Sequence, residues 1–151
     1  MKIFIGADHR GFFLKKKIVK FLRDKGHAVI DVGIGVAGKI CDYPYVSRKV
    51  ALAVTKSKDG RGILACLTGI GHSIAANKIP GTRATLCYTP KAAFLSRAHN
   101  DSNILIIGAK FVNKRDILKI VDVWLKTEFE GGRHRRRVNQ IKRIEKEICK
   151  R

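Results

Sequence analysis

The segment with the clearest potential for chemistry is a cysteine followed by a glycine-rich turn. Residues 66–73 run Cys-Leu-Thr-Gly-Ile-Gly-His-Ser and follow the apolar stretch 62–66. Glycines at such a turn expose backbone N–H groups that can hold an anion or a developing oxyanion. We expect Cys66 at a strand end facing a helix N-terminus, where its pKa should be lowered and its thiolate stabilised. A buried structural cysteine is the alternative interpretation of this segment alone.

Two further polar segments flank apolar runs. Asp8 and His9 directly follow the first run, and the cluster 96–101, which contains His99 and Asn100, precedes the last run. In parallel sheets ligands bind at the carboxyl ends of strands. We therefore expect these two segments and the cysteine turn to lie together at that edge of a sheet.

The elements that would position these residues follow from the hydrophobic pattern. Short apolar runs typical of buried strands alternate with amphipathic patterns typical of helices, which indicates βαβ units and a parallel sheet covered on both faces. The expected strands are 2–7, 27–32, 62–66, 83–88 and 103–108, and the expected helices are 11–25, 44–54, 74–77, 90–98, 113–127 and 135–150. Nothing resembling a linker divides the chain, so we expect one domain over 1–151. The last helix carries an apolar stripe with no further strand to cover, and must pack on its own subunit or on a partner.

Composition narrows the classes of protein. With 45% hydrophobic and 29% charged residues the chain is not intrinsically disordered. The longest purely aliphatic run, 104–107, is too short to cross a bilayer, and residues 1–25 lack a signal-peptide core. We expect a cytoplasmic protein whose four cysteines are reduced thiols. Their spacing with histidine fits no zinc site, so no metal is expected.

The charge balance predicts anionic partners. Lys and Arg total 32 against 12 Asp and Glu, a formal net charge of +20. Phosphorylated metabolites, nucleic acid and acidic membranes would all be attracted. The positive residues are spread along the chain, and no aromatic platform, helix-turn-helix signal or RNP-like motif is present. A nucleic-acid-binding protein is therefore a remote alternative, as is a redox-active thiol protein, because no resolving cysteine lies near Cys66.

Five stretches, in order and over nearly the whole chain, resemble the ribose/galactose isomerase family and its type B ribose-5-phosphate isomerases. They are 6–11 (GADHRG), 42–44 (DYP), 62–78 (GILACLTGIGHSIAANK), 95–103 (LSRAHNDSN) and 130–137 (EGGRHRRR). The resemblance implies a Rossmann-like three-layer α/β/α sandwich with a five-stranded parallel sheet and a C-terminal extension helix. It implies a homodimer or dimer of dimers, a small phosphorylated sugar as substrate, and no metal or organic cofactor. The implied reaction interconverts ribose 5-phosphate and ribulose 5-phosphate through an enediolate.

The resemblance also implies roles for individual residues. Cys66 would be the base, the Thr68 hydroxyl would assist backbone N–H groups in holding the enediolate, and His99 would open the furanose ring. Implied substrate-binding residues are Asp8, His9, Tyr43, Leu67, Gly69, Ile70, Gly71 and Asn100. Implied phosphate-binding residues are Arg133, Arg137 and Lys110. Each site would be shared, with Cys66 from one subunit and His99 from its dimer mate.

Three residues depart from the family pattern. Leu67 stands where glycine is usual, and leucine resists a positive φ and would narrow the pocket. His72 replaces an apolar residue, and glutamate is the base at this position in the branch that lacks the cysteine; we expect His72 to titrate near neutral pH and tune the thiolate. Lys110 replaces an arginine, keeping the charge without the bidentate fork. Because Leu67 and His72 line the region that would set the pocket length, a hexose 6-phosphate, such as allose or galactose 6-phosphate, stays open as the alternative substrate.

Overall fold

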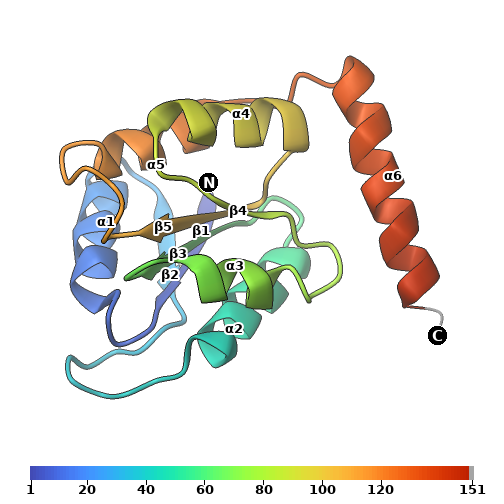
Figure 1. Cartoon of the computed structure of the whole chain (residues 1–151). Coiled ribbons are helices and arrows are strands. Elements are labelled where there is room, and N and C mark those ends of the chain that lie inside the picture. Colours follow the sequence, from blue (N-terminus) through green and yellow to red (C-terminus); the bar gives the residue numbers. More distant parts are fainter. Residues whose placement is uncertain (150–151) are drawn as a thin grey trace.

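Strands and helices alternate along the chain in the computed structural model, which describes residues 1–149 (Figure 1). The strands are β1 (Lys2–Ala7), β2 (Ala28–Asp31), β3 (Arg61–Cys66), β4 (Ala84–Leu86) and β5 (Ile104–Gly108). The helices are α1 (Phe12–Asp24), α2 (Tyr43–Thr55), α3 (Ile70–Ala76), α4 (Pro90–Asn100), α5 (Ile117–Lys126) and α6 (Gly132–Ile148). The described helices include none that is both long and apolar enough to span a membrane.

All neighbouring strands pair in parallel, in the order β2-β1-β3-β5-β4. Successive side chains of a strand point to opposite faces, so Ile3 and Ile5 enter one core and Phe4 the other. Helices α1, α4 and α5 cover the first face, and α2 and α3 cover the second (Figure 1). The three-layer α/β/α sandwich expected from the sequence is confirmed.

The order of the strands places a topological switch point between β1 and β3. These strands are neighbours, yet the helices that follow them, α1 and α3, lie on opposite faces of the sheet. The two chain segments therefore diverge as they leave the sheet, and the gap at such a switch point is where open α/β sheets bind ligands. Asp8 directly follows β1, and Cys66 is the last residue of β3.

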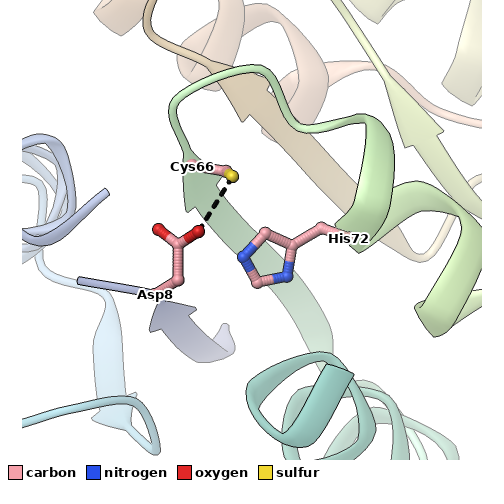
Figure 2. Close-up of side chains that lie close together, drawn as sticks. All are labelled: Asp8, Cys66 and His72. Carbon is pink, nitrogen blue, oxygen red and sulfur yellow. Dashed lines mark hydrogen bonds between the residues drawn. The ribbon is translucent and has the colours of Figure 1, made fainter. Parts of the chain in front are cut away.

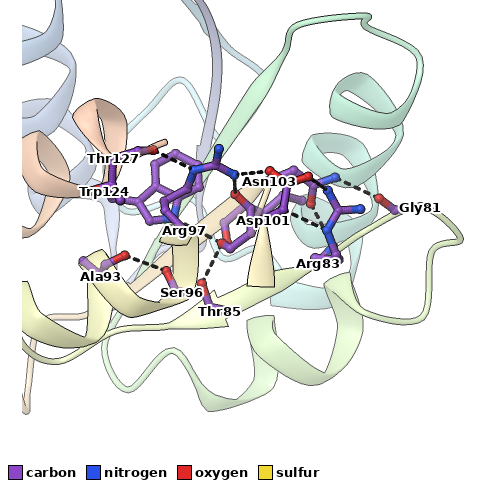
Figure 3. A network of polar contacts seen from close by, with 12 residues as sticks. Gly81, Arg83, Thr85, Ala93, Ser96, Arg97, Asp101, Asn103, Trp124 and Thr127 are labelled. Atoms are coloured by element: carbon purple, nitrogen blue, oxygen red, sulfur yellow. Dashed lines mark hydrogen bonds and ion pairs between the residues drawn. The ribbon is translucent and has the colours of Figure 1, made fainter. Parts of the chain in front are cut away.

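The expectation that His99 and Asn100 share this edge is wrong. They end α4, which runs back across the sheet and leads into the amino end of β5, so they lie at the opposite edge (Figure 1). A polar network fixes that turn: the guanidinium of Arg97 donates to Asp101 Oδ1 at 2.8 Å, and that of Arg83 donates to Asp101 Oδ2 at 2.8 Å (Figure 3). A residue that directly precedes a parallel strand lies at the amino end of that strand, so the position of His99 before β5 takes it away from the carboxyl edge.

Several helix boundaries also differ from the expected ones. α3 begins at Ile70 rather than residue 74, because Gly69 adopts a left-handed φ of 81° that starts the helix early. Asn113 does not cap α5; its side chain accepts from Arg115 N, and the helix begins at Ile117. α6 begins at Gly132, not 135, and packs against α4 through its first half. Its buried Val138 belongs to the expected apolar stripe, whose remaining isoleucines, Ile141, Ile144 and Ile148, are exposed.

Candidate active site

Cys66 and Asp8 meet at the carboxyl edge of β1 and β3. The Cys66 thiol donates a hydrogen bond to Asp8 Oδ2 at 3.1 Å (Figure 2). The other carboxylate oxygen of Asp8 accepts from the backbone N–H of Gly11 at 2.8 Å, which fixes the carboxylate on the turn after β1. Only 7% of Cys66 and 5% of Asp8 are exposed. The pair is therefore a buried thiol hydrogen-bonded to a buried carboxylate.

The expectation that Cys66 has a lowered pKa is wrong. Burial raises the pKa of the Cys66 thiol, because the charged thiolate loses hydration, and the negative Asp8 raises it further. The backbone N–H groups of Gly69 and Thr68 do favour the thiolate, as expected from the turn, but burial outweighs them. In the free protein Cys66 is therefore a protonated thiol at neutral pH.

The turn after Cys66 is held by the end of β5 and by the residues that follow it. The backbone N–H of Lys110 donates to Leu67 O at 2.8 Å, and Gly108 packs directly against the Thr68 backbone, where a Cβ would come within 2.1 Å of its carbonyl oxygen. The expected strain at Leu67 is absent: within residues 1–149 the only non-glycine residue with a positive φ is Asp101. Leucine therefore fits the backbone at position 67 without this strain.

His72 on α3 lies next to the Cys66–Asp8 pair, and Tyr43 on α2 packs against His72. His72 is fully buried, its Nδ1 lies 2.7 Å from Ser47 Oγ, and Tyr43 packs edge-to-face on its ring. The Tyr43 ring also covers Gly71, where a Cβ would approach it to 2.6 Å. Burial lowers the pKa of His72 to about 4, with the Asp8 charge opposing the shift. The expectation of titration near neutral pH is therefore wrong, and a neutral imidazole cannot stabilise the thiolate by charge.

His9, Ile70 and Lys110 lie in the segments that follow β1, β3 and β5. His9 is exposed, and its Nδ1 lies 3.3 Å from Cys41 O. Ile70 is half exposed, and Thr68 Oγ1 accepts from its backbone N–H. Lys110, two residues after the end of β5, is exposed, with its ammonium group 5.9 Å from the centre of the Phe111 ring.

A second cluster lies at the opposite edge. The rings of His99 and His134 stack with their centres 4.0 Å apart, and Glu130 Oε2 lies 3.7 Å and 3.6 Å from their Nε2 atoms. Burial, with the charges of His99 and Arg133 adding to it, lowers the pKa of His134. Asn100 and the guanidinium-bearing Arg133 and Arg137 are exposed beside this cluster, at the end of α4 and the start of α6.

Sequence reasoning missed three contributors to these clusters. Ser47, one helical turn after Tyr43, holds His72, and Glu130 and His134 pack on His99. The i, i+4 spacing of Glu130 and His134 at the start of a helix was visible in the sequence, but their approach to His99 was not. Asp8, Cys66 and His72 offer ligand atoms within 4.8 Å of one another, as do His99, Glu130 and His134, a spacing that a divalent metal ion could also use.

The sequence matches one protein family over most of its length. Residues 3–141 match the family model described as Ribose/Galactose Isomerase. Ribose-5-phosphate isomerase B of Escherichia coli (strain K12) is 48% identical over 144 residues, which cover 95% of this chain and 96% of that protein.

The fold of the chain is similar to solved structures of ribose-5-phosphate isomerase B. The chain is similar to ribose-5-phosphate isomerase B of Clostridium thermocellum, with a TM-score of 0.94, 50% identity, and coverage of 98% of this chain and 99% of that one. It is also similar to the Mycoplasma genitalium enzyme with bound ribulose 5-phosphate, with a TM-score of 0.92, 44% identity and coverage of 97% of each chain. The chain belongs to the ribose/galactose isomerase family.

Proposed function

We propose that this chain is an aldose–ketose isomerase that interconverts ribose 5-phosphate and ribulose 5-phosphate. The observation that carries the proposal is the buried Cys66–Asp8 pair under the turn 67–71, in a chain of this family. The relatives named ribose-5-phosphate isomerase B, one of them solved with ribulose 5-phosphate, support the choice of sugar. A substrate of this kind and the four free cysteines are consistent with a cytoplasmic enzyme.

The reaction moves a proton between adjacent carbons. A base must remove it from the carbon next to a carbonyl, and the resulting enediolate needs hydrogen-bond donors. Cys66 is the proposed base. Its thiol is protonated at rest, so its proton must first leave, and the Asp8 carboxylate that already accepts its hydrogen bond is the nearest acceptor. The thiolate then takes the C2 proton of the aldose and returns it to C1.

The turn 67–71 is the proposed oxyanion hole. The N–H groups of Thr68 and Gly69 already favour negative charge on Cys66 in the free protein. With the N–H groups of Leu67, Ile70 and Gly71 and the Thr68 hydroxyl, they would favour the same charge on the enediolate oxygen. His9, Tyr43 and Lys110 border the pocket and would contact the sugar phosphate.

Ring opening and phosphate binding are assigned to the second cluster. His99, with Asn100 beside it, would donate the proton that opens the furanose, and Arg133 and Arg137 would hold the phosphate through charge-assisted hydrogen bonds. These residues lie at the opposite edge of the sheet from Cys66 within one chain. The proposal therefore includes a homodimer, alone or as a dimer of dimers, in which a two-fold axis brings one subunit's His99 to the other's Cys66.

Parallel assays of purified protein against ribose 5-phosphate, allose 6-phosphate and galactose 6-phosphate test the proposal. We expect the highest kcat/KM with ribose 5-phosphate. Cys66→Ser should lose nearly all turnover and keep substrate binding, because the serine hydroxyl stays neutral and is a far weaker base than the thiolate of cysteine. Cys149→Ser, at an exposed cysteine, is the matched control and should behave like wild type. A higher kcat/KM with a hexose 6-phosphate would show that this sugar, and not ribose 5-phosphate, is the substrate. Full activity in Cys66→Ser would show that Cys66 is not the base.

A further inference from the structure

The hydrogen bonds of His72 fix which of its ring nitrogens carries the proton. Ser47 Oγ donates to the Tyr43 carbonyl oxygen at 2.9 Å, and a carbonyl oxygen can only accept. The single hydroxyl proton of Ser47 is thereby used. Ser47 Oγ must then accept from His72 Nδ1, 2.7 Å away, so the neutral ring carries its proton on Nδ1. Nε2 is left as a bare lone pair.

This lone pair is buried and has no partner. No side chain or backbone group within residues 1–149 hydrogen-bonds to Nε2, although the ring is completely inaccessible. Buried acceptors in native proteins are almost always satisfied, so an orphan at a reactive site points to a donor that arrives with a ligand. The low pKa of His72, about 4, keeps the lone pair free at neutral pH.

The lone pair also faces the reacting atoms. A ring nitrogen of His72, Cys66 Sγ and an Asp8 carboxylate oxygen lie within 4.8 Å of one another. In Figure 2 the unbonded nitrogen is on the ring edge turned toward Asp8 and Cys66, and the other nitrogen points back toward α2. A hydroxyl on a carbon placed against Sγ would lie on the same side of the ring as Nε2, and substrate binding would have to uncover this nitrogen, which the free protein buries completely. The missing donor is therefore a hydroxyl on a reacting carbon.

Aldose–ketose isomerisation has a second proton to move. Besides the carbon-bound proton, the hydroxyl proton on O2 of the aldose must reach O1, because O2 ends as a carbonyl oxygen and O1 as a hydroxyl. We propose that His72 Nε2 accepts this proton from O2 and delivers it to O1; this inference rests on the proposed function.

The step balances without any co-reactant. The Cys66 thiolate takes the C2 proton, and the electron pair of that bond forms the C1–C2 double bond while the C1 carbonyl becomes an oxyanion. Nε2 takes the O2 proton and gives it to O1. The C2 carbonyl then forms, and the Cys66 thiol returns its proton to C1. A neutral imidazole suits this task because it can accept and release a proton at one nitrogen.

The test separates the two proton transfers. With ribulose 5-phosphate in D2O, removal of a C1 proton and its return as deuterium requires only Cys66, whereas formation of ribose 5-phosphate also requires the hydroxyl transfer. We expect His72→Leu to lower isomerisation by roughly a hundredfold, the lower end of the range for general acid–base groups. Deuterium incorporation at C1, followed by NMR, should fall much less, so the ratio of exchange to product rises at least about tenfold.

His72→Gln is the matched variant. Its amide oxygen can accept the substrate hydrogen bond but cannot carry a proton, so KM should recover toward wild type while the raised exchange ratio remains. Equal loss of exchange and isomerisation in His72→Leu, or no change in either, would overturn the role of His72. If the wild-type protein does neither, the proposed function itself fails, and the inference fails with it.

A measurement on the unmodified protein guards against variants that do not fold. The 15N spectrum of histidine-labelled protein should show His72 protonated at Nδ1 and bare at Nε2, and Ser47→Ala should mix the two tautomers. A wild-type ring protonated at Nε2 would refute the inference, because that nitrogen would then be a donor.

Discussion

Complementation between two inactive variants tests whether each active site combines Cys66 of one subunit with His99 of the other. Within one chain, Cys66 ends β3, whose six residues span about 20 Å at roughly 3.3 Å per residue. His99 lies near the end of α4, whose eleven residues rise about 16 Å from the carboxyl edge toward the amino edge. One bound pentose phosphate cannot bridge that separation and still contact both side chains.

The expected magnitude follows from counting sites. Cys66→Ala and His99→Ala should each be nearly inactive alone. After equal amounts are unfolded and refolded together, random pairing makes about half the dimers mixed, and each mixed dimer carries one doubly damaged site and one intact site. Isomerase activity should return to roughly a quarter of wild type.

The control pairs two lesions from the same cluster. Cys66→Ala refolded with Asp8→Asn should recover nothing, because every site in that mixture keeps one damaged residue from the Cys66–Asp8 pair. If the Cys66→Ala and His99→Ala mixture also recovered nothing, with mixed dimers confirmed by native mass spectrometry, each subunit would build its site alone. That result would mean that Cys66 and His99 of one chain act on the same substrate despite lying at opposite edges of the sheet.

Three further outcomes follow from the site. Because the pKa of His72 is lowered to about 4 in the folded protein, its contribution to stability is complete above the unfolded pKa near 6.5 and is lost as the pH falls toward 4. Between pH 7 and 4, the free energy of unfolding of His72→Leu, measured with urea, should therefore fall by up to about 3 kcal/mol less than that of wild type. If the two proteins lost the same free energy of unfolding over this range, the lowered pKa of His72 would be contradicted. Because burial raises its pKa, Cys66 should react slowly with iodoacetamide at pH 7 and faster above pH 9, as followed by mass spectrometry; rapid labelling at pH 7 would show a stabilised thiolate. Gly108→Ala should lower kcat at least about tenfold by pushing the Thr68 backbone, whereas Gly35→Ala, where a Cβ meets nothing within 4 Å, should match wild type in steady-state assays.

The elements of the fold were determined by local sequence. Alternating apolar runs and amphipathic stretches predicted five strands and six helices. They did so because an element buried on one or both faces needs apolar residues at the spacing that its geometry dictates. The glycine at position 26 and the proline at 44 marked real helix ends, since their backbone preferences act within a few residues. Cys66 and Asp8 were expected at strand ends for the same local reason.

The relation between distant segments was decided by tertiary structure. The sequence placed His99 near a strand, but only the crossover through α4 determines that it lies at the amino edge. Nor could it show that Ser47 would meet His72, because a contact between residues on separate helices depends on how α2 and α3 pack.

The pKa of Cys66 was also decided by tertiary structure. The turn around Cys66 is local, and its N–H groups favour a thiolate as the sequence suggested. The sign of the pKa shift is nevertheless set by how completely the sheet and Asp8 enclose the sulfur, and that enclosure exists only in the folded chain. Desolvation is a property of everything packed around a group, so no local pattern of residues determines it.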